Sequence, residues 1–146
     1  MRNGIIGMTC LSVACSLCHA APGGEPKKIV TDFFTAAFVD RKPAEAAMQY
    51  VSPDKYIQHN PNGKDGRESF INGFAKYVES TGYKCEIKRV IAEQDLVVVH
   101  SHCKEKPADR GNAVVDIFRV ENALIVEHWD VLQAVPESPR NSNTMF

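Results

Sequence analysis

The sequence predicts an α+β domain in which helices pack on one face of a curved antiparallel sheet. Apolar residues recur at helical spacing in the first half of the chain, from Lys28 to Ser80. From Lys84 to Gln133 they follow strand spacing instead. Helices followed by a run of strands are typical of α+β folds. A sheet that curves around a helix leaves a cavity between the two.

Three helices and one short extended piece are expected before the strands. The helices are predicted over 28–39, 44–50 and about 66–80. The first carries an aromatic stripe that is more typical of core packing than of a cofactor site. Pro43 suits the first turn of the second helix, and Gly82 suits the C-terminal cap of the third. Residues 56–63 form an extended piece that ends in a turn at Pro61 and Gly63.

Four strands are predicted over 84–91, 96–103, 113–120 and 123–133. If the first hairpin is centred on Gln94, Cys85 and Cys103 lie opposite each other within disulfide reach. Direct cross-strand disulfides are geometrically strained, and a register slip would separate the two residues. A disulfide and a pair of free core thiols therefore both remain open.

The N-terminal segment has the layout of a secretory signal peptide: one Arg, an apolar run rich in small residues, and Ala20-Ala21-Pro22. We expect residues 1–21 to be a signal peptide, residues 22–146 to be a single domain, and the protein to be exported to the periplasm or secreted. Cys15–His19 matches the c-type haem pattern, but it lies inside the segment expected to be removed. A lipoprotein is disfavoured because Ser12 stands where a lipobox usually carries Leu.

Charge argues against nucleic acid as a partner. Removing Arg2 leaves 17 − 1 = 16 basic residues against 18 acidic ones, which gives a mature charge of −2. No long basic run is present, whereas phosphate binding requires clustered Lys and Arg. No membrane contact is expected once the signal peptide is removed.

The candidate catalytic residues lie on the last two predicted strands. If even positions face inward, Asp116 lies near His128 and Asp130 among apolar residues. Burial and like-charge repulsion raise the pKa of a carboxyl group, which makes it a proton donor or acceptor near neutral pH. His128 would orient either acid or transfer the proton itself. The alternative is a hydrogen-bonded structural network without catalysis.

No metal or cofactor is predicted. The histidines His59, His100, His102 and His128, together with the two aspartates, make a metal site conceivable, but none has a compact ligand spacing such as His-x-x-x-His. The mature sequence also contains no nucleophile elbow and no glycine-rich phosphate loop.

Four segments, YIQHNPNGKDGRESF, IKRVIAEQDLVVVHSHC, VVDIFRVENALIVEHWDVLQ and NSNTMF, together resemble the SnoaL-like polyketide cyclases of the nuclear-transport-factor-2-like superfamily. The resemblance extends from about Ile29 to the C-terminus and implies a cone-shaped, cystatin-like α+β fold. In the cyclases an Asp on the last strand is the general acid/base, and this position matches Asp130. A cyclase pocket His falls on Asp116 here, so the inherited mechanism is altered at this position. The superfamily also includes ketosteroid isomerases, epoxide hydrolases, dehydratases and binding proteins.

The resulting hypothesis is a cofactor-free enzyme for a small apolar carbonyl compound, catalysing aldol-type cyclisation or isomerisation. Asp130 would move the proton next to the carbonyl, while Asp116 and His128 would stabilise the enolate. The expected substrate-binding residues are His59, Tyr56, Phe74, Phe118 and Trp129. The alternative is an exported carrier that uses the same cavity, and a homodimer formed through the outer sheet face is also expected.

Overall fold

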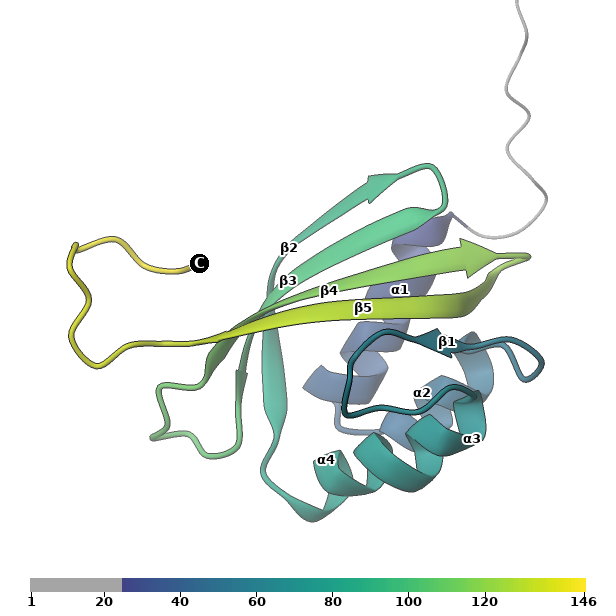
Figure 1. Ribbon diagram of the computed structural model, residues 1–146, viewed down its shortest axis with the longest axis horizontal. Coiled ribbons are helices and arrows are strands. Elements are labelled where there is room, and N and C mark those ends of the chain that lie inside the picture. The colour runs from purple at the N-terminus through teal and green to yellow at the C-terminus, as the bar shows by residue number, and fades with distance from the viewer. Residues whose placement is uncertain (1–24) are drawn as a thin grey trace, which may run out of the picture.

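A curved sheet covered on one face by helices is the framework of residues 25–146, which the computed structural model describes (Figure 1). The strands are β1 (Ile57–Gln58), β2 (Lys84–Glu93), β3 (Leu96–Lys104), β4 (Asn112–Glu121) and β5 (Leu124–Ala134). Their order in the sheet is β1-β5-β4-β3-β2. The predicted class and the meander of four long antiparallel strands are confirmed. The predicted signal peptide and the haem pattern lie outside the described residues.

The helices contain two π-helical turns that the sequence pattern did not indicate. The elements are α1 (Pro26–Phe34), η1 (Thr35–Val39), α2 (Pro43–Tyr50), α3 (Arg67–Phe70), η2 (Ile71–Ala75) and α4 (Lys76–Ser80). The π turn η1 continues α1, and η2 joins α3 to α4. Each π turn carries one aromatic residue, Phe38 or Phe74, and the two ring centroids lie 5.9 Å apart. Such turns occur frequently at functional sites.

The hydrophobic core lies between α1 and the inner face of the sheet. Phe33 is its centre: its ring lies 6.0 Å from Phe38, 6.3 Å from Phe70 and 5.7 Å from Phe118 on β4. Burying large aromatic side chains supplies much of the stability of a small domain. The predicted aromatic stripe is therefore core packing.

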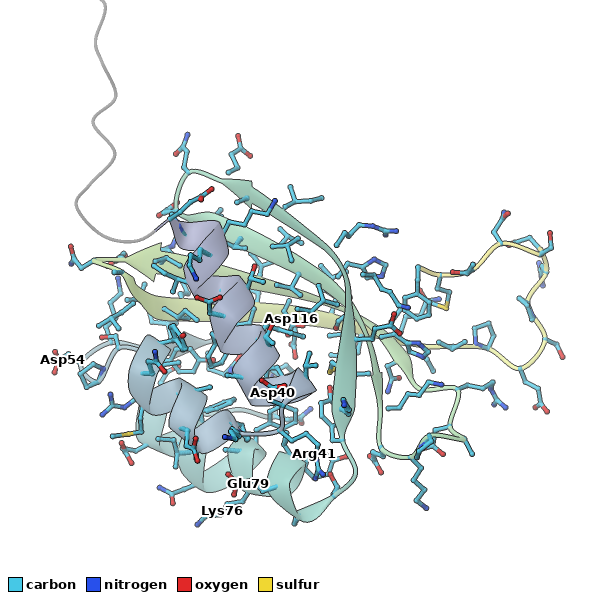
Figure 2. All side chains as sticks on the ribbon, turned by 180° about the vertical axis from the view of Figure 1, so that it is seen from behind. Asp40, Arg41, Asp54, Lys76, Glu79 and Asp116 are labelled. Carbon is cyan, nitrogen blue, oxygen red and sulfur yellow. A yellow bond between two sulfur atoms is a disulfide. The ribbon has the colours of Figure 1, made fainter. Side chains whose placement is uncertain are left out.

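Arg41 ties the segment between η1 and α2 to the end of α4. Its guanidinium donates to the backbone oxygen of Val78 at 2.9 Å and also to that of Thr81. These are carbonyls that a helix end leaves without intrahelical partners. Figure 2 shows Arg41 beside Glu79 at this end of the helix layer. The contact holds α4 in place next to the sheet.

A β-bulge sets the register that joins Cys85 to Cys103. Near the turn the paired positions of β2 and β3 sum to 189, as for Glu93 and Leu96. An extra residue, Lys88, shifts the register, so that Cys85 lies opposite Cys103 and forms a disulfide with it. Without the bulge, Cys85 would face Lys104 and point to the other side of the sheet. The predicted pairing is correct, although the hairpin is centred half a residue beyond Gln94.

The β4–β5 hairpin closes through Asn122 and Ala123, both with positive φ, 49° and 63°. Such values are those of a two-residue type I′ turn, which usually carries Asn-Gly. On its other edge β5 pairs in parallel with β1, an interaction absent from the predicted meander. This pairing places Gln58 opposite His128.

The C-terminal tail returns to the outer face of the sheet (Figure 1). The ring of Phe146 stacks on His102 at 4.3 Å and on His100 at 5.7 Å, and the Lys88 ammonium lies 5.2 Å from its centroid. His100 and His102 are therefore separated by the sheet from the aspartates of the inner face.

None of the helices in residues 25–146 is both long and apolar enough to cross a membrane.

Candidate active site

A cavity of about 440 Å³ lies between the helices and the inner face of the sheet. The aromatic part of its wall is built by Phe33, Phe34, Phe38, Tyr56, Phe70, Phe74, Tyr77, Tyr83 and Phe118. Phe74, Tyr77 and Leu132 remain substantially exposed and therefore form part of the mouth. A hollow of this size and composition suits a small, largely apolar molecule.

The polar part of the cavity wall comes from β4 and β5. Asp116, His128 and Asp130 all line the cavity, so these three positions face inward as predicted. Asp116 lies directly opposite Asp130, and the His128 Nε2 atom lies 3.0 Å from Asp116 Oδ1. Figure 2 shows Asp116 on the side of the sheet that α1 covers. The strand register alone brings these three side chains together.

Gln58 fixes the tautomer of His128. The backbone N–H of Asn60 donates to Gln58 Oε1 at 2.8 Å, which identifies this amide atom as the acceptor. The same oxygen lies 3.0 Å from His128 Nδ1, so Nδ1 must carry a proton and donate it. His128 Nε2 is then free to share a second proton with Asp116. The pair therefore exists either as carboxylic acid and imidazole or as carboxylate and imidazolium.

Asn60 holds Asp130. Its side-chain nitrogen donates to Asp130 Oδ1 at 2.9 Å and to Oδ2 at 2.7 Å. The orientation of this amide is fixed because Asn60 Oδ1 accepts the backbone N–H of Asn62 at 2.8 Å. Asp130 thus receives a neutral donor, whereas its neighbour Asp116 is paired with an imidazole.

Burial raises the pKa of Asp116, and the charge of Asp130 raises it further, while the hydrogen bond to His128 opposes both effects. Burial likewise raises the pKa of Tyr56 and of Tyr83, and the charges of both aspartates add to each shift. The two phenols therefore stay protonated at neutral pH. Carboxyl groups with such different surroundings are what acid/base catalysis requires.

Ligand atoms of Asp116, His128 and Asp130 lie within 4.8 Å of one another, close enough to hold a metal ion. His128 Nε2 would then have to give up the proton it shares with Asp116. The hydrogen bonds seen here satisfy these groups without an ion. The predicted absence of a metal stays a prediction.

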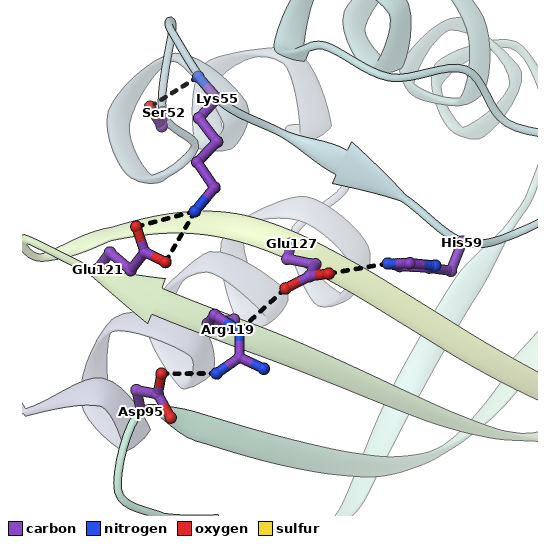
Figure 3. Close-up of polar contacts among 7 residues, drawn as sticks. All are labelled: Ser52, Lys55, His59, Asp95, Arg119, Glu121 and Glu127. Atoms are coloured by element: carbon purple, nitrogen blue, oxygen red, sulfur yellow. Dashed lines mark hydrogen bonds and ion pairs between the residues drawn. The ribbon is translucent and has the colours of Figure 1, made fainter.

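His59 and Trp129 are not among the cavity-lining residues, which corrects their predicted placement at the cavity. Their rings stack at 4.7 Å on the outer face of the sheet. His59 Nε2 lies 2.9 Å from Glu127 Oε1, and Glu127 also accepts from Arg119 at 2.9 Å (Figure 3). Arg119 continues this network to Asp95 at 2.7 Å. Strand alternation explains the error for Trp129, since its neighbours His128 and Asp130 already occupy the inner face.

Tyr56, Phe74 and Phe118 do line the cavity. Sequence reasoning missed Gln58 and Asn60, although both stand beside His59 in the extended piece predicted over residues 56–63. The signal that identifies them is alternation: if His59 faces outward, its two neighbours face inward. Tyr83 and Glu105 were also missed. Tyr83 directly precedes β2 and Glu105 directly follows β3, so the alternating pattern does not assign either side chain to a face of the sheet.

Comparison with known proteins places this architecture in a family. Residues 30–128 match the family described as SnoaL-like domain. No curated protein gives a significant match to the sequence. Solved structures share the fold: an NTF-2 like protein of unknown function from Burkholderia xenovorans has a TM-score of 0.63 and 14% identity, with 79% of this chain and 88% of that chain covered.

Two further solved structures carry names that refer to enzymes. A candidate ketosteroid isomerase from Kribbella flavida has a TM-score of 0.62 and 13% identity, covering 83% of this chain and 87% of that chain. A candidate polyketide cyclase from Acidithiobacillus ferrooxidans has a TM-score of 0.59 and 15% identity, covering 77% and 91%. At these identities the likeness concerns the nuclear-transport-factor-2-like fold alone.

Proposed function

The chain belongs to the SnoaL-like family, and on that premise we propose that it is an enzyme that moves a proton next to the carbonyl of a small, largely apolar molecule. The reaction is an aldol-type cyclisation or an isomerisation. The observation that carries the proposal is the pair of opposed carboxyl groups, Asp116 and Asp130, which share an aromatic cavity but differ in their hydrogen-bond partners.

Asp130 is the general base in this proposal. Its carboxylate removes the proton from the carbon next to the carbonyl, and the electron pair of that C–H bond moves to the carbonyl oxygen. Asn60 orients the carboxylate through hydrogen bonds to both of its oxygens. Fixing a base in this way reduces the entropic cost of reaching the reactive geometry.

Asp116 and His128 supply the proton for the enolate oxygen. The pair holds one proton between Asp116 Oδ1 and His128 Nε2, in addition to the one that Gln58 fixes on Nδ1. Donating it stabilises the developing negative charge inside a cavity where few waters compete. The enol carbon then attacks a second carbonyl, whose oxygen takes the proton held by Asp130, or another carbon of the enol takes that proton. In both routes the enol O–H proton returns to the Asp116–His128 pair as the carbonyl re-forms, and Asp130 ends the cycle as a carboxylate.

Export is part of the proposal. A disulfide between Cys85 and Cys103 suits an oxidising compartment such as the periplasm or the extracellular medium. Together with the signal-like residues 1–21, it supports an enzyme that works outside the cytoplasm.

Hydrogen–deuterium exchange tests the chemistry without knowledge of the substrate. NMR in D₂O measures how fast deuterium enters the position next to the carbonyl of acetophenone and cyclohexanone. We expect the wild type to accelerate exchange and Asp130→Asn to lose roughly 100-fold or more. Glu121→Gln is the control, since it removes an exposed carboxylate that pairs with Lys55 outside the cavity.

The binding measurement separates an enzyme from a carrier. Wild-type protein that binds these ketones but does not accelerate exchange would contradict catalysis and favour a carrier. Equal exchange in wild type and Asp130→Asn would contradict the role of Asp130.

A further inference from the structure

Within residues 25–146, no Lys or Arg side chain balances the carboxyl groups that line the cavity. Glu105 lines it together with Asp116 and Asp130, and no Lys or Arg is found among its described lining residues. Asp116 and His128 are neutral as a pair in either position of their shared proton. The proposed reaction requires Asp130 to be a carboxylate. The cavity then carries two negative charges, one on Asp130 and one on Glu105. Carboxylates within low-dielectric walls focus their field into the hollow.

Glu105 stands at the mouth, apart from the catalytic pair. It follows β3 and is exposed, and the hydroxyl of Tyr77 on α4 donates to its Oε1 atom. This hydrogen bond raises the pKa of Tyr77 to about 12 and keeps the phenol protonated as the donor. Among the described residues, no hydrogen bond to the other carboxylate oxygen, Oε2, is found, so it remains available to a ligand.

Aromatic rings surround the same place. Phe74 lies 5.7 Å from Tyr77 and 5.5 Å from Tyr83, and the rings of Tyr77 and Tyr83 lie 5.8 Å apart. Ring faces attract ammonium groups, and more strongly where solvent is partly excluded. Burial raises the pKa of Tyr83, and the charges of Asp116, Asp130 and Glu105 raise it further, so this phenol stays protonated.

We propose that the ligand carries a positively charged amine, which Glu105 and the rings of Phe74, Tyr77 and Tyr83 hold at the mouth while the carbonyl lies at Asp130. This inference rests on the proposed function and deepens it by naming the charge of the substrate. An anionic substrate would meet two carboxylates and no cation. Lys64 does not compensate them, because it lines an adjoining surface hollow and not this cavity.

Three matched probes test the proposal: 4′-(trimethylammonio)acetophenone, 4′-tert-butylacetophenone and 4-acetylbenzoate. The first two have nearly the same shape and differ in charge, and the third is an anion. Isothermal titration at low salt measures the dissociation constant of each. We expect the cation to bind at least fivefold more tightly than the neutral ketone, and the anion to bind most weakly.

The variant Glu105→Gln keeps an acceptor for Tyr77 and removes one charge. We expect it to reduce the cation-to-neutral preference at least threefold. Glu79→Gln is the matched control, because it makes the same charge change at an exposed position of α4 outside the cavity and should leave the preference unchanged. A cation that fails to bind or binds no better than the neutral ketone, or a preference that survives Glu105→Gln, would overturn the proposal.

The binding measurement tests the cation site, and the exchange measurement tests the proposed enzyme, so either proposal can fail without the other. A cation preference without deuterium exchange would remove the enzyme and keep the cation site. Deuterium exchange without a cation preference would keep the enzyme and remove the cation site.

Discussion

Asp116 and Asp130 face each other directly across β4 and β5, but their hydrogen-bond partners differ. Asp116 lies 3.0 Å from an imidazole nitrogen, whereas Asp130 accepts two bonds from a neutral amide. Two carboxyl groups whose surroundings separate their proton affinities can take opposite roles in one reaction.

Asp116 should make the stability of the protein depend on pH. Burial raises its pKa above the ordinary value of 3.8, so the folded state keeps a proton that the unfolded chain has released. The free energy of unfolding should therefore fall as the pH rises above 3.8 towards the folded-state pKa. Asp116→Asn, which does not titrate at this position, should lack this contribution. Urea unfolding at a series of pH values measures the difference, with the exposed Asp54→Asn as control. A parallel pH dependence in Asp116→Asn and wild type would contradict the assignment.

Gln58→Leu should disturb the tautomer of His128. The substitution leaves Nδ1–H without its acceptor, which costs about 1 to 3 kcal/mol of stability in a buried site. Proton-transfer activity should fall roughly 10- to 100-fold, because the imidazole is no longer held in one orientation. Nitrogen-15 NMR reports directly whether Nδ1 or Nε2 carries the proton. Gln133→Leu on the exposed end of β5 serves as control, and an unchanged His128 spectrum in Gln58→Leu would refute the role of Gln58.

Ala123→Gly should stabilise the protein. Ala123 has a φ of 63°, a left-handed conformation that costs a non-glycine residue about 1 to 2 kcal/mol. Glycine adopts it freely but loses more chain entropy on folding, so we expect a net gain of about 0.5 kcal/mol. Thermal or urea unfolding measures the change. Ala134→Gly, at the far end of β5 and without a positive φ, should instead destabilise the protein.

Reduction of the disulfide should destabilise the domain. Cys85 and Cys103 are 18 positions apart, and closing a loop of this length contributes about 3 kcal/mol by restricting the unfolded chain. Urea unfolding with and without reductant measures the loss. The double variant Cys85→Ala with Cys103→Ala should be insensitive to reductant, and a wild type equally insensitive would show that the bond contributes nothing to stability.

Much of the fold was predictable because periodicity records which residues are buried. Strand alternation put His128 and Asp130 on one face of the last strand. Which face points inward stayed open in the sequence, because the odd positions also carry apolar residues such as Ile117 and Val131. His59 was misplaced because β1 is only two residues long, and so short a strand does not show in the sequence which of its faces points inward. Its parallel pairing with β5, and therefore the approach of Gln58 to His128, depends on tertiary contacts that a single sequence does not record.

The two π turns could not be predicted from the sequence pattern either. A helix that includes η1 or η2 keeps its amphipathic pattern over most of its length, and one additional residue changes the phase only locally. Glu105 was missed for another reason: it follows the last residue of β3, so alternation assigns it no side of the sheet.

The extra residue at Lys88 constrains how the β2–β3 hairpin can change in length among related sequences. The number of β2 residues between the hairpin tip and Cys85 must stay matched to the number of β3 residues up to Cys103, with one more on β2 for the bulge, if the two sulfur atoms are to meet. Natural variants that gain or lose one or two residues on β2 alone should lack both cysteines or compensate by an equal change on β3, because Cys85 would otherwise no longer lie directly opposite Cys103. The numbers of residues on the two strands of this hairpin would then indicate whether a relative is crosslinked, even where the cysteines themselves are difficult to align.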